Sequence, residues 1–417
     1  MSKLIVQGGH RLVGAIPVHG AKNSALPLLS ATLLGTTPSV LHNCPRLSDV
    51  DTSIKILSHL GCKATQEGTN VTVDASEAGQ YEIPDSLMRE MRSSVVFLGA
   101  IVARQGKARI SFPGGCELGP RPIDLHLKAL RKLGLVIEED HGYLNCHVGK
   151  GLRGCSINLS FPSVGATENI MLASSTAAGT TIITNAAREP EICDLADFLN
   201  QCGARIRGAG ESTIRIDGVP KLHGAEHAVI ADRITATTYM AAAAVTGGDL
   251  TLENVIPAHL EPVIPVFEEA GCHIQVKDHQ LHIAAPERIK AVKNIRTLPY
   301  PGFPTDSQAI VMAMATLAEG TSVFVENIFE SRYKHVGELL RLGAHIKVEG
   351  KVAIVEGVDH LSGAPVEAAD LRGAAALVVA GLAAQGTTQI TGLHHLDRGY
   401  EMIEQRLSGV GAVIKRD

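Results

Sequence analysis

The sequence predicts an α/β protein of two domains, built from six copies of one supersecondary unit. The chain has 417 residues, which is too long for a single ordinary core. Hydrophobic residues make up 45% of it and charged residues 19%, as in globular proteins, but aromatic residues only 3%. The cores must therefore be built from Ala, Val, Leu and Ile, which suits packed layers of helices and sheets.

The strongest signal is an internal repeat of a small-residue helix, a glycine and a short β-rich run. The glycines stand 66 to 73 residues apart, at Gly35, Gly106, Gly179, Gly248, Gly320 and Gly386. We expect them to end the helices as left-handed C-caps. Since these helices are apolar around most of their circumference, we expect them to be buried. An amphipathic helix and a strand hairpin follow each copy, although the last copy is truncated, so each unit is βαβαββ.

Six such units divide into two domains of three, residues 22–230 and residues 1–21 with 231–417. The N-terminal strand "KLIVQGG" is assigned to the second domain, because the last strand, in "GAVIKRD", also lacks a partner. The chain would then cross between domains twice, which predicts a hinge and a cleft suited to a small ligand. A solenoid is the competing architecture, but units of this length with two helices exceed usual solenoid repeats.

Composition and motifs exclude several classes of function. The net charge of −5 and the scarcity of Tyr and Phe argue against nucleic-acid binding. The chain has no P-loop, dinucleotide fingerprint, nucleophile elbow or HExxH motif. Its eight cysteines form no CxxC pair, so we expect neither a metal nor a cofactor. With no signal peptide and no membrane-length apolar run, we expect reduced thiols, a cytoplasmic location and no membrane partner. Nothing indicates an oligomeric state.

Polar residues at the starts of the buried helices indicate a site for anions. Helix N-termini offer unpaired N–H groups and the positive end of the helix dipole. Lys22 and Asn23 begin the first such helix, Arg92 the second, and Arg372 the last. Further arginines in polar segments suit bidentate recognition of carboxylate or phosphate, although each alone could be an ordinary surface residue.

Two candidate reactive residues lie in proline-flanked loops. Cys116 occupies "FPGGCELGPRPID", where no packing role is evident, so it is either an inert thiol or a catalytic one. Asp306, in "PGFPTDSQA", is either the N-cap of its helix or a rigidly held base. Glu330 and Asp370 carry the same ambiguity.

Eight segments, in order and at matching spacing, resemble those of one enzyme family over essentially the whole chain. They are "HGAKNSALP", "PGGCELGPRPIDLHL", "SVGATENIM", "NAAREPEICDLA", "FPTDSQA", "IFESRYKHV", "DLRGAAALV" and "DRGYEMIE". They resemble the enolpyruvyl transferases, and within them the UDP-N-acetylglucosamine 1-carboxyvinyltransferases. The resemblance implies two inverted α/β domains, each a pseudo-threefold set of βαβαββ units with buried helices and outer sheets.

The implied reaction transfers enolpyruvate from phosphoenolpyruvate to the 3′-hydroxyl of UDP-N-acetylglucosamine, releasing phosphate, at the start of peptidoglycan synthesis. It proceeds by addition and elimination through a tetrahedral ketal. The partners are these two small molecules.

Matching positions give the implied site residues. Cys116 is the proton donor, able to form a covalent adduct, and Asp306 is the base. Catalytic roles also fall to Lys22 and Arg398. The residues implied to bind phosphoenolpyruvate are Lys22, Asn23, Arg121, Arg332, Arg372 and Arg398. The residues implied to contact the nucleotide sugar are Arg92, Arg121, Pro122, Ile123, Asp124, Leu125, Ser163, Val164, Gly165, Asp306 and Ile328.

One position departs from the family pattern. Phe161 stands in "FPSVGAT" where some relatives have a lysine, so diphosphate binding would rest more on backbone N–H groups and Arg121. The glycines and prolines around Cys116 also predict a lid that delivers this thiol on closure. Two alternatives stay open, an enolpyruvyl transferase acting on shikimate 3-phosphate and a catalytically silent paralogue that binds a UDP-sugar.

Overall fold

The computed structural model describes residues 2–112 and 123–417, which divide into two compact units. The first unit comprises residues 20–112 and 123–230, and the second comprises residues 2–19 and 231–417. The chain passes from one to the other between His19 and Gly20 and again between Ile230 and Ala231. That the units are separate domains stays a prediction.

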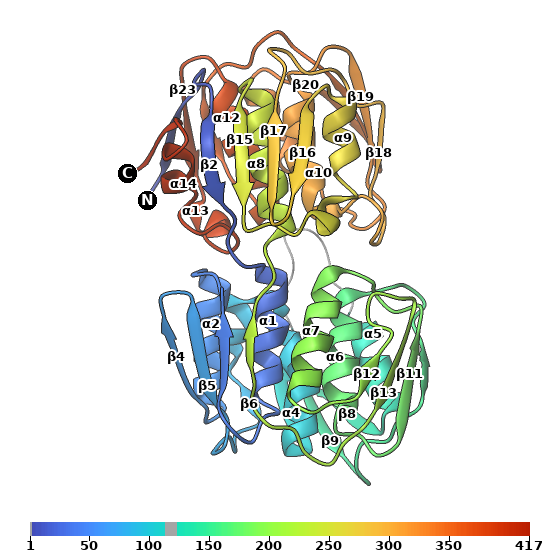
Figure 1. The fold of residues 1–417 in the computed structure, drawn as a ribbon. Coiled ribbons are helices and arrows are strands. Elements are labelled where there is room, and N and C mark those ends of the chain that lie inside the picture. The colour runs from blue at the N-terminus through green and yellow to red at the C-terminus, as the bar shows by residue number, and fades with distance from the viewer. Residues whose placement is uncertain (1, 113–122) are drawn as a thin grey trace. The chain divides into compact units, whose positions relative to one another are not determined.

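The first unit places three four-stranded sheets around buried helices (Figure 1). The sheets have the strand orders β14-β3-β5-β4, β6-β7-β9-β8 and β10-β11-β13-β12. The helices are α1 (Lys22–Thr32), α2 (Ser48–His59), α3 (Asp85–Glu90), the 3-10 helix η1 (Arg92–Val96), α4 (Phe97–Gln105), α5 (Asp124–Lys132), α6 (Val164–Ser174) and α7 (Pro190–Gln201). The strands are β3 (Ser39–His42), β4 (Lys63–Glu67), β5 (Asn70–Asp74), β6 (Glu82–Ile83), β7 (Lys107–Ser111), β8 (Leu135–Asp140), β9 (Tyr143–Val148), β10 (Ser156–Asn158), β11 (Thr180–Thr184), β12 (Ile206–Arg207), β13 (Thr213–Asp217) and β14 (Glu226–Ala228).

The second unit repeats this arrangement with the strand orders β16-β17-β15-β2, β18-β19-β21-β20 and β22-β23-β1-β24. Its helices are α8 (Arg233–Val245), the 3-10 helix η2 (Pro257–Leu260), α9 (Ile264–Glu269), α10 (Thr305–Ala315), α11 (Val336–Arg341), α12 (Leu371–Ala383), α13 (Leu393–Leu396) and α14 (Ile403–Ser408). Its strands are β1 (Leu4–Gln7), β2 (Val13–Pro17), β15 (Asp249–Glu253), β16 (His273–Lys277), β17 (Gln280–Ala284), β18 (Asn294–Arg296), β19 (Thr321–Val325), β20 (His345–Glu349), β21 (Val352–Glu356), β22 (Pro365–Glu367), β23 (Thr387–Thr391) and β24 (Val413–Arg416).

The N-terminal strand completes the truncated sixth unit. In the other sheets a short strand runs parallel to the central one, which then pairs antiparallel with a hairpin, as in β6, β7, β9 and β8. In the last sheet β1 takes the place of the missing hairpin strand, with Leu4 opposite both Ile390 of β23 and Arg416 of β24. This explains why neither end of the sequence had a local partner strand.

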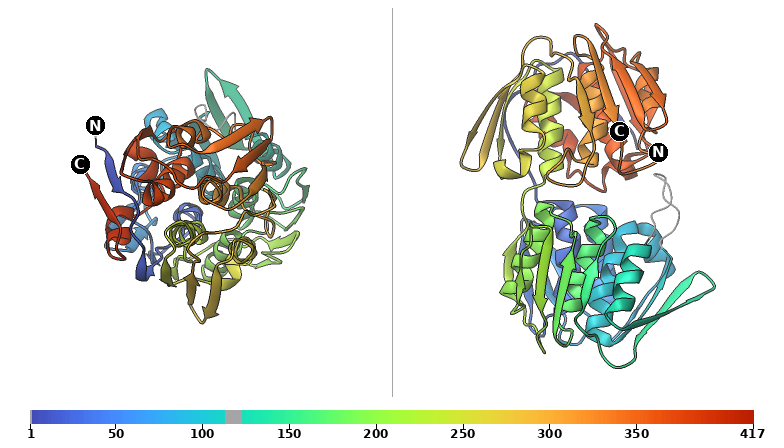
Figure 2. Two further views of the ribbon diagram at one scale, coloured as in Figure 1. Left: turned by 90° about the horizontal axis from the view of Figure 1, so that it is seen from above. Right: turned by 90° about the vertical axis from the view of Figure 1, so that its right-hand side faces the viewer.

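The buried helices lie inside the sheets in each unit (Figure 2). Eleven of the thirteen residues of α12 are buried, which fits a helix that is Ala, Val and Leu on every side. The amphipathic α5 instead buries only four of nine, namely His126, Leu127, Ala129 and Leu130. The two helix classes predicted from the repeat therefore occupy inner and outer positions.

The expectation that glycine caps every buried helix was wrong. Only Gly106 is itself a left-handed C-cap, at the end of α4 with φ of 69°. Other helices end earlier, and a hydroxyl near the end bonds a last-turn carbonyl. Thr32 donates to Leu29 O at 2.6 Å, and Ser175 donates to Met171 O at 2.8 Å. Met171 O also accepts from Ser175 N at 3.1 Å, so this hydroxyl adds to a backbone bond at a helix end that has no glycine cap.

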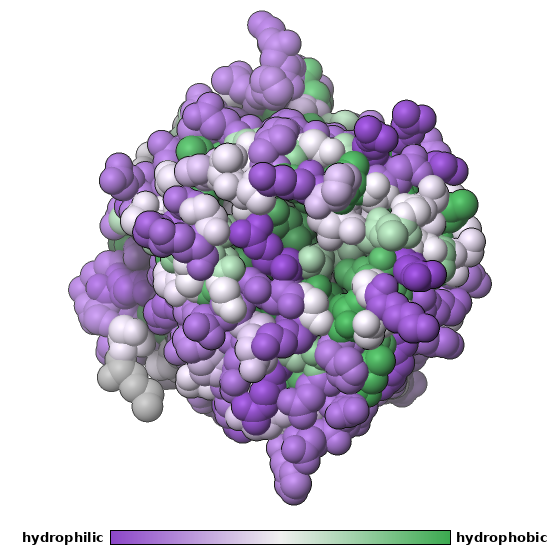
Figure 3. All heavy atoms as spheres, turned by 90° about the horizontal axis from the view of Figure 1, so that it is seen from below, coloured by the Kyte–Doolittle hydropathy of each residue, from purple (hydrophilic) through white to green (hydrophobic). Residues whose placement is uncertain are grey.

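The face of the molecule shown in Figure 3 is mainly polar. In the face shown in Figure 3, hydrophilic residues dominate the rim and hydrophobic residues gather in small groups nearer the centre. Among residues 2–112 and 123–417, no helix is both long and apolar enough to cross a membrane.

Candidate active site

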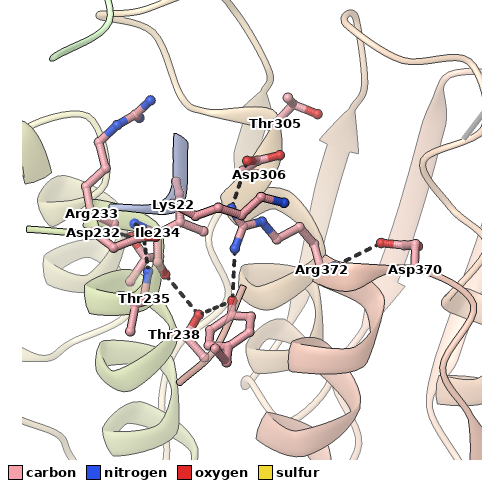
Figure 4. A network of polar contacts seen from close by, with 12 residues as sticks. Lys22, Asp232, Arg233, Ile234, Thr235, Thr238, Thr305, Asp306, Asp370 and Arg372 are labelled. Carbon is pink, nitrogen blue, oxygen red and sulfur yellow. Dashed lines mark hydrogen bonds and ion pairs between the residues drawn. The ribbon is translucent and has the colours of Figure 1, made fainter. Parts of the chain in front are cut away.

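In the second unit, one aspartate is held by two buried arginines (Figure 4). Arg332 Nη2 lies 2.8 Å from Asp306 Oδ1, and Arg372 Nη2 lies 3.0 Å from Asp306 Oδ2. The two arginine side chains are only 3% exposed, whereas the aspartate side chain is 28% exposed. The carboxylate thus stands at the edge of the protein interior, with its charge balanced from within.

The position of Asp306 in α10 shows that it is not the N-cap of that helix. The N-cap of α10 is Pro304, which makes no side-chain capping bond within the described chain, and Asp306 is the second residue of the helix. Its carboxylate bonds the guanidinium groups of Arg332, on the loop before α11, and of Arg372, on α12, so the prediction that Asp306 is an N-cap was wrong. Asp370, by contrast, is an N-cap, since its Oδ1 accepts from Arg372 N at 2.9 Å and Gly373 N at 3.0 Å.

A chain of hydrogen bonds joins this cluster to a third buried helix. Arg372 Nη1 donates to the Tyr400 hydroxyl at 3.4 Å, and that hydroxyl lies 2.8 Å from Thr238 Oγ1 on α8. Asp232 caps α8, accepting from Ile234 N at 2.8 Å. Figure 4 shows the Arg372 side chain reaching from α12 between Asp306 and the first turns of α8. The helix starts that the sequence placed far apart therefore meet in one polar network.

Burial and nearby charges together raise the pKa of one group in this network, Arg372, and lower that of another, His335. Burial opposes ionisation of Arg372, but the Asp306 carboxylate together with Tyr400 and Asp232 outweighs it and raises the pKa of that guanidinium above its usual value. Burial lowers the pKa of His335 to about 4, with the positive charge of Arg332 acting the same way and Asp370 opposing. The cluster thus holds two permanent cations beside an uncharged imidazole at neutral pH.

A buried glutamate shapes the loop that carries Ile328 and Arg332. Glu326 is 1% exposed, and its Oε1 accepts from the backbone N–H groups of Ile328 at 2.8 Å and Phe329 at 3.0 Å. Its Oε2 accepts from the Thr305 hydroxyl at 3.0 Å, beside the start of α10. Arg332 Nη2 also donates to Thr305 O at 3.0 Å. Glu326 therefore fixes both the loop before Arg332 and the start of α10, where Asp306 lies.

The remaining predicted residues of the second unit lie on the loops around this cluster. Arg398 is half-buried between α13 and α14, and Ile328 is half-buried after β19. Glu330 is exposed and takes no part in the cluster.

In the first unit the predicted lysine is buried and paired. Lys22 begins α1, is 7% exposed, and its Nζ lies 2.7 Å from Asp49 Oδ2 on α2. Asp49 itself is 1% exposed. Asn23 follows on α1 and is half-buried. A buried cation needs a nearby anion, and Asp49 supplies it.

The structure brings together two segments that the sequence assigned to the nucleotide sugar. Ser163 is the N-cap of α6, accepting from Ala166 N at 3.3 Å, so α6 begins at Val164. A Cβ on Gly165 would lie 2.9 Å from His126 Cε1 of α5, so a larger residue there would displace the His126 ring. The start of α6, with Val164, therefore lies against α5.

The remaining residues of these segments lie at the start of α5. Ile123 is its N-cap and is 6% exposed, Asp124 is exposed, and Leu125 is half-buried. Phe161 is 41% exposed, two residues before the N-cap of α6.

Several predicted residues cannot be placed. Cys116, Arg121 and Pro122, with the proposed lid, lie outside the described residues. Arg92 is the first residue of η1.

Sequence reasoning missed the groups that hold the predicted residues in place. Asp49, Glu326, Tyr400 and Thr238 are buried, and although Tyr400 lies in the segment "DRGYEMIE", the sequence predicted no role for any of the four. The available signal was a charged residue in a buried helix with no oppositely charged residue next to it in the sequence. A buried charge requires a partner of opposite charge in the folded structure. The described residues contain no group of three or more His, Cys, Asp or Glu side chains placed to hold a metal.

Comparisons with known proteins now decide the family. Residues 6–407 match the family model described as EPSP synthase (3-phosphoshikimate 1-carboxyvinyltransferase). The UDP-N-acetylglucosamine 1-carboxyvinyltransferase 2 of Caldanaerobacter subterraneus subsp. tengcongensis is 55% identical over 416 residues, covering 100% of both chains. The UDP-N-acetylglucosamine 1-carboxyvinyltransferase of Geobacter metallireducens is 50% identical, covering 100% of this chain and 99% of the relative. The chain belongs to the UDP-N-acetylglucosamine 1-carboxyvinyltransferase family, as its motifs predicted.

Solved structures give the same answer for the fold. The enolpyruvyl transferase NikO from Streptomyces tendae matches with a TM-score of 0.90 and 26% identity, covering 100% of this chain and 98% of that one. EPSP synthase from Acinetobacter baumannii matches with a TM-score of 0.75 at 19% identity, covering 100% and 99%, and supports the fold alone. The predicted fold class is confirmed.

Proposed function

We propose that this member of the family transfers the enolpyruvyl group of phosphoenolpyruvate to the 3′-hydroxyl of UDP-N-acetylglucosamine and releases phosphate. The observation that carries the proposal is the carboxylate of Asp306 held between two buried arginines, Arg332 and Arg372. This arrangement offers a fixed base beside a fixed receptor for a carboxylate. Both are what addition of an alcohol to an enol phosphate needs. The product commits a nucleotide sugar to peptidoglycan synthesis, and both substrates suit a cytoplasmic location.

The reaction balances as an addition followed by an elimination. A proton added to the methylene carbon C3 makes C2 electrophilic, and the sugar oxygen bonds to C2 while its own proton goes to a base. This gives a tetrahedral ketal that still carries the phosphate. Loss of phosphate from C2 and of one proton from C3 restores the double bond on the sugar.

In the second unit, Asp306 is the proposed base. Both carboxylate oxygens are held at 2.8 Å and 3.0 Å by Arg332 and Arg372, so the side chain keeps one orientation and the ionised form is stabilised. The same two guanidinium groups, together with Arg398, are proposed to hold the carboxylate of phosphoenolpyruvate. Ile328 is proposed to contact the sugar nucleotide on the loop that Glu326 fixes.

In the first unit, Lys22 and Asn23 are proposed to hold the phosphate at the start of α1, where the helix dipole also favours an anion. Arg121 is proposed to bind the same group. The nucleotide sugar is proposed to lie along the starts of α5 and α6, at Ile123, Asp124, Leu125, Ser163, Val164 and Gly165, with Arg92, Arg121 and Pro122 adding contacts.

Cys116 is the proposed acid that protonates C3. A thiol with a reference pKa near ~8.5 is mostly protonated at neutral pH, as an acid must be. The same sulfur can attack C2 and form a covalent adduct. Its segment lies outside the described residues, so this role is proposed from the sequence alone.

The test is phosphate release by the purified protein from phosphoenolpyruvate, measured with UDP-N-acetylglucosamine, with shikimate 3-phosphate, and with neither. We expect release only with the nucleotide sugar. Release with shikimate 3-phosphate would instead favour 3-phosphoshikimate 1-carboxyvinyltransferase activity, which the description of the matching family model names. Binding of the nucleotide sugar without release in any mixture would indicate a silent paralogue. If phosphate is released only with the nucleotide sugar, Cys116→Ala and Asp306→Ala should each lower the rate of phosphate release.

A further inference from the structure

The start of α1, which carries Lys22 and Asn23, is weaker as a helix than its role requires. Its N-cap is Ala21, which makes no side-chain capping bond within the described chain, unlike the aspartate caps of α8 and α12. Pro27 lies inside the helix and has no N–H to donate to the carbonyl of Asn23. The first turn therefore lacks two of the bonds that normally define a helix start.

A buried aspartate on α7 fastens this turn from the side. Asp194 is 3% exposed, and its Oδ2 accepts a short hydrogen bond from the hydroxyl of Ser24, two residues after Lys22. The same oxygen lies 3.4 Å from the N–H of Ile230. Ile230 O in turn accepts from Ala21 N at 2.6 Å. One carboxylate oxygen of Asp194 thus bonds both Ser24 of α1 and Ile230, and Ile230 in turn bonds Ala21, the residue before α1.

The other oxygen of the carboxylate is fixed by a histidine. His227 Nε2 lies 2.7 Å from Asp194 Oδ1, and its ring packs against Phe198 with centroids 5.7 Å apart. Its Nδ1 lies 3.2 Å from Gln201 Oε1. Both oxygens of Asp194 therefore have defined donors, and the side chain has little freedom to turn.

We propose that Asp194 is a positioning residue that fixes the first turn of α1 through Ser24 and thereby sets where Lys22 and Asn23 point. The assignment of these two residues to phosphoenolpyruvate rests on the proposed function. Asp194 itself reaches neither, since its contacts are with Ser24, His227 and Ile230. It acts on the substrate only through the helix.

A nucleophilic triad is the chemical alternative, and the bonding order excludes it. In a serine triad the imidazole stands between hydroxyl and carboxylate and accepts the hydroxyl proton. Here the carboxylate stands between Ser24 and His227, so no imidazole faces the hydroxyl, and Ser24 is fully buried, out of reach of a substrate. Ser24, Asp194 and His227 therefore form a structural hydrogen-bond network.

Two substitutions at Asp194 separate geometry from charge. Asp194→Asn keeps an oxygen for Ser24 and Ile230 and offers its amide group to His227, which can accept in its other tautomer. Asp194→Leu keeps the branch at Cγ but removes every acceptor. We expect Asp194→Asn to stay close to the parent, while Asp194→Leu raises KM for phosphoenolpyruvate by about 10-fold or more. KM for UDP-N-acetylglucosamine should be unchanged in both.

Ser24→Ala serves as the milder variant if Asp194→Leu fails to fold. It removes one hydroxyl from the same bond and should raise the same KM in the same direction. The matched control is Thr180→Ala, which breaks another hydroxyl–carboxylate bond of the first unit, 2.6 Å from Asp217, away from α1. The control should leave both KM values at the parent level.

A second readout does not depend on activity. Lys22 is 7% exposed, so an amine-acetylating reagent followed by mass spectrometry should label it slowly in the parent. Labelling should increase several-fold in Asp194→Leu and Ser24→Ala but not in Asp194→Asn or Thr180→Ala. Because this pattern needs no turnover, it tests Asp194 even if the transferase activity is absent.

Unchanged KM for phosphoenolpyruvate and unchanged Lys22 labelling in a folded Ser24→Ala or Asp194→Leu protein would overturn the proposal. An equal rise in both KM values would also overturn it, since that is the result of a general loss of structure. Failure of the parent to release phosphate would overturn the proposed function instead.

Discussion

Replacing Asp306 by asparagine tests the carboxylate cluster most sharply. The change keeps the shape and one oxygen but removes the charge that two buried guanidinium groups face at 2.8 Å and 3.0 Å. Breaking a fully buried pair costs about 3–5 kcal/mol, and because the aspartate is partly exposed we expect about 2 kcal/mol here. For a unit of this size that lowers the midpoint of thermal unfolding by about 4–8 °C.

The same substitution should separate binding from catalysis. Without Asp306 as a competing carboxylate, Arg332 and Arg372 can turn fully to the carboxylate of phosphoenolpyruvate. The ligand should therefore raise the unfolding midpoint of Asp306→Asn more than that of the parent. Loss of a general base should lower kcat by about 10²–10⁴-fold.

Differential scanning fluorimetry with and without phosphoenolpyruvate, together with phosphate-release kinetics, measures both effects. Arg341→Gln is the matched control, since its pair with Glu338 at 3.3 Å is on the surface and should contribute little. A variant that keeps the parental kcat would refute the assignment of Asp306 as the base. A variant that keeps the parental stability would refute the view that it balances the two arginines.

Three further outcomes follow from the structure. Lys22→Met leaves the buried carboxylate of Asp49 without its lysine, so chemical denaturation should show a loss of about 2–3 kcal/mol that Asp49→Asn in the same chain partly restores; no loss would contradict the ion pair. Burial, with the charges of Glu191 and Glu189, raises the pKa of Glu168 to about 8, so the folded state keeps a proton that the unfolded state loses near its ordinary value. Stability should therefore fall as pH rises from about 4.5 to about 8, and Glu168→Gln should flatten this fall in thermal midpoints; equal slopes would contradict it. Burial also raises the pKa of the Cys62, Cys146, Cys202 and Cys272 thiols to about 11 or 12, so iodoacetamide at pH 8 should label Cys116 first, and mass spectrometry showing earlier labelling elsewhere would contradict this.

The fold was readable from the sequence because its signal is repeated. Helices apolar on every side, such as α12, can only be buried, and a truncated last unit requires a strand from elsewhere. The pairing of β1 with β24 meets that requirement. The glycine caps were predicted wrongly, since α4 ends at its predicted glycine, Gly106, but helices such as α6 end several residues before theirs.

The candidate site was readable only as a set of residues, not as a geometry. Motifs marked Asp306, Arg332 and Arg372, but which of them pair depends on how α10 and α12 pack, and local sequence does not specify that. The same holds for Lys22, whose partner Asp49 lies on the next helix, and for Asp194, whose contact with Ser24 joins residues 170 positions apart. Side-chain partners across distant segments follow from tertiary packing, so they appear only in the structure.

The central claim is tested most directly by identifying the product. The parent protein is incubated with phosphoenolpyruvate, UDP-N-acetylglucosamine and shikimate 3-phosphate together, and both acceptors are analysed by mass spectrometry beside the phosphate released. We predict that the nucleotide sugar gains one enolpyruvyl group for each phosphate released, while shikimate 3-phosphate is unchanged. Phosphate released without that adduct, or an adduct on shikimate 3-phosphate, would contradict the account.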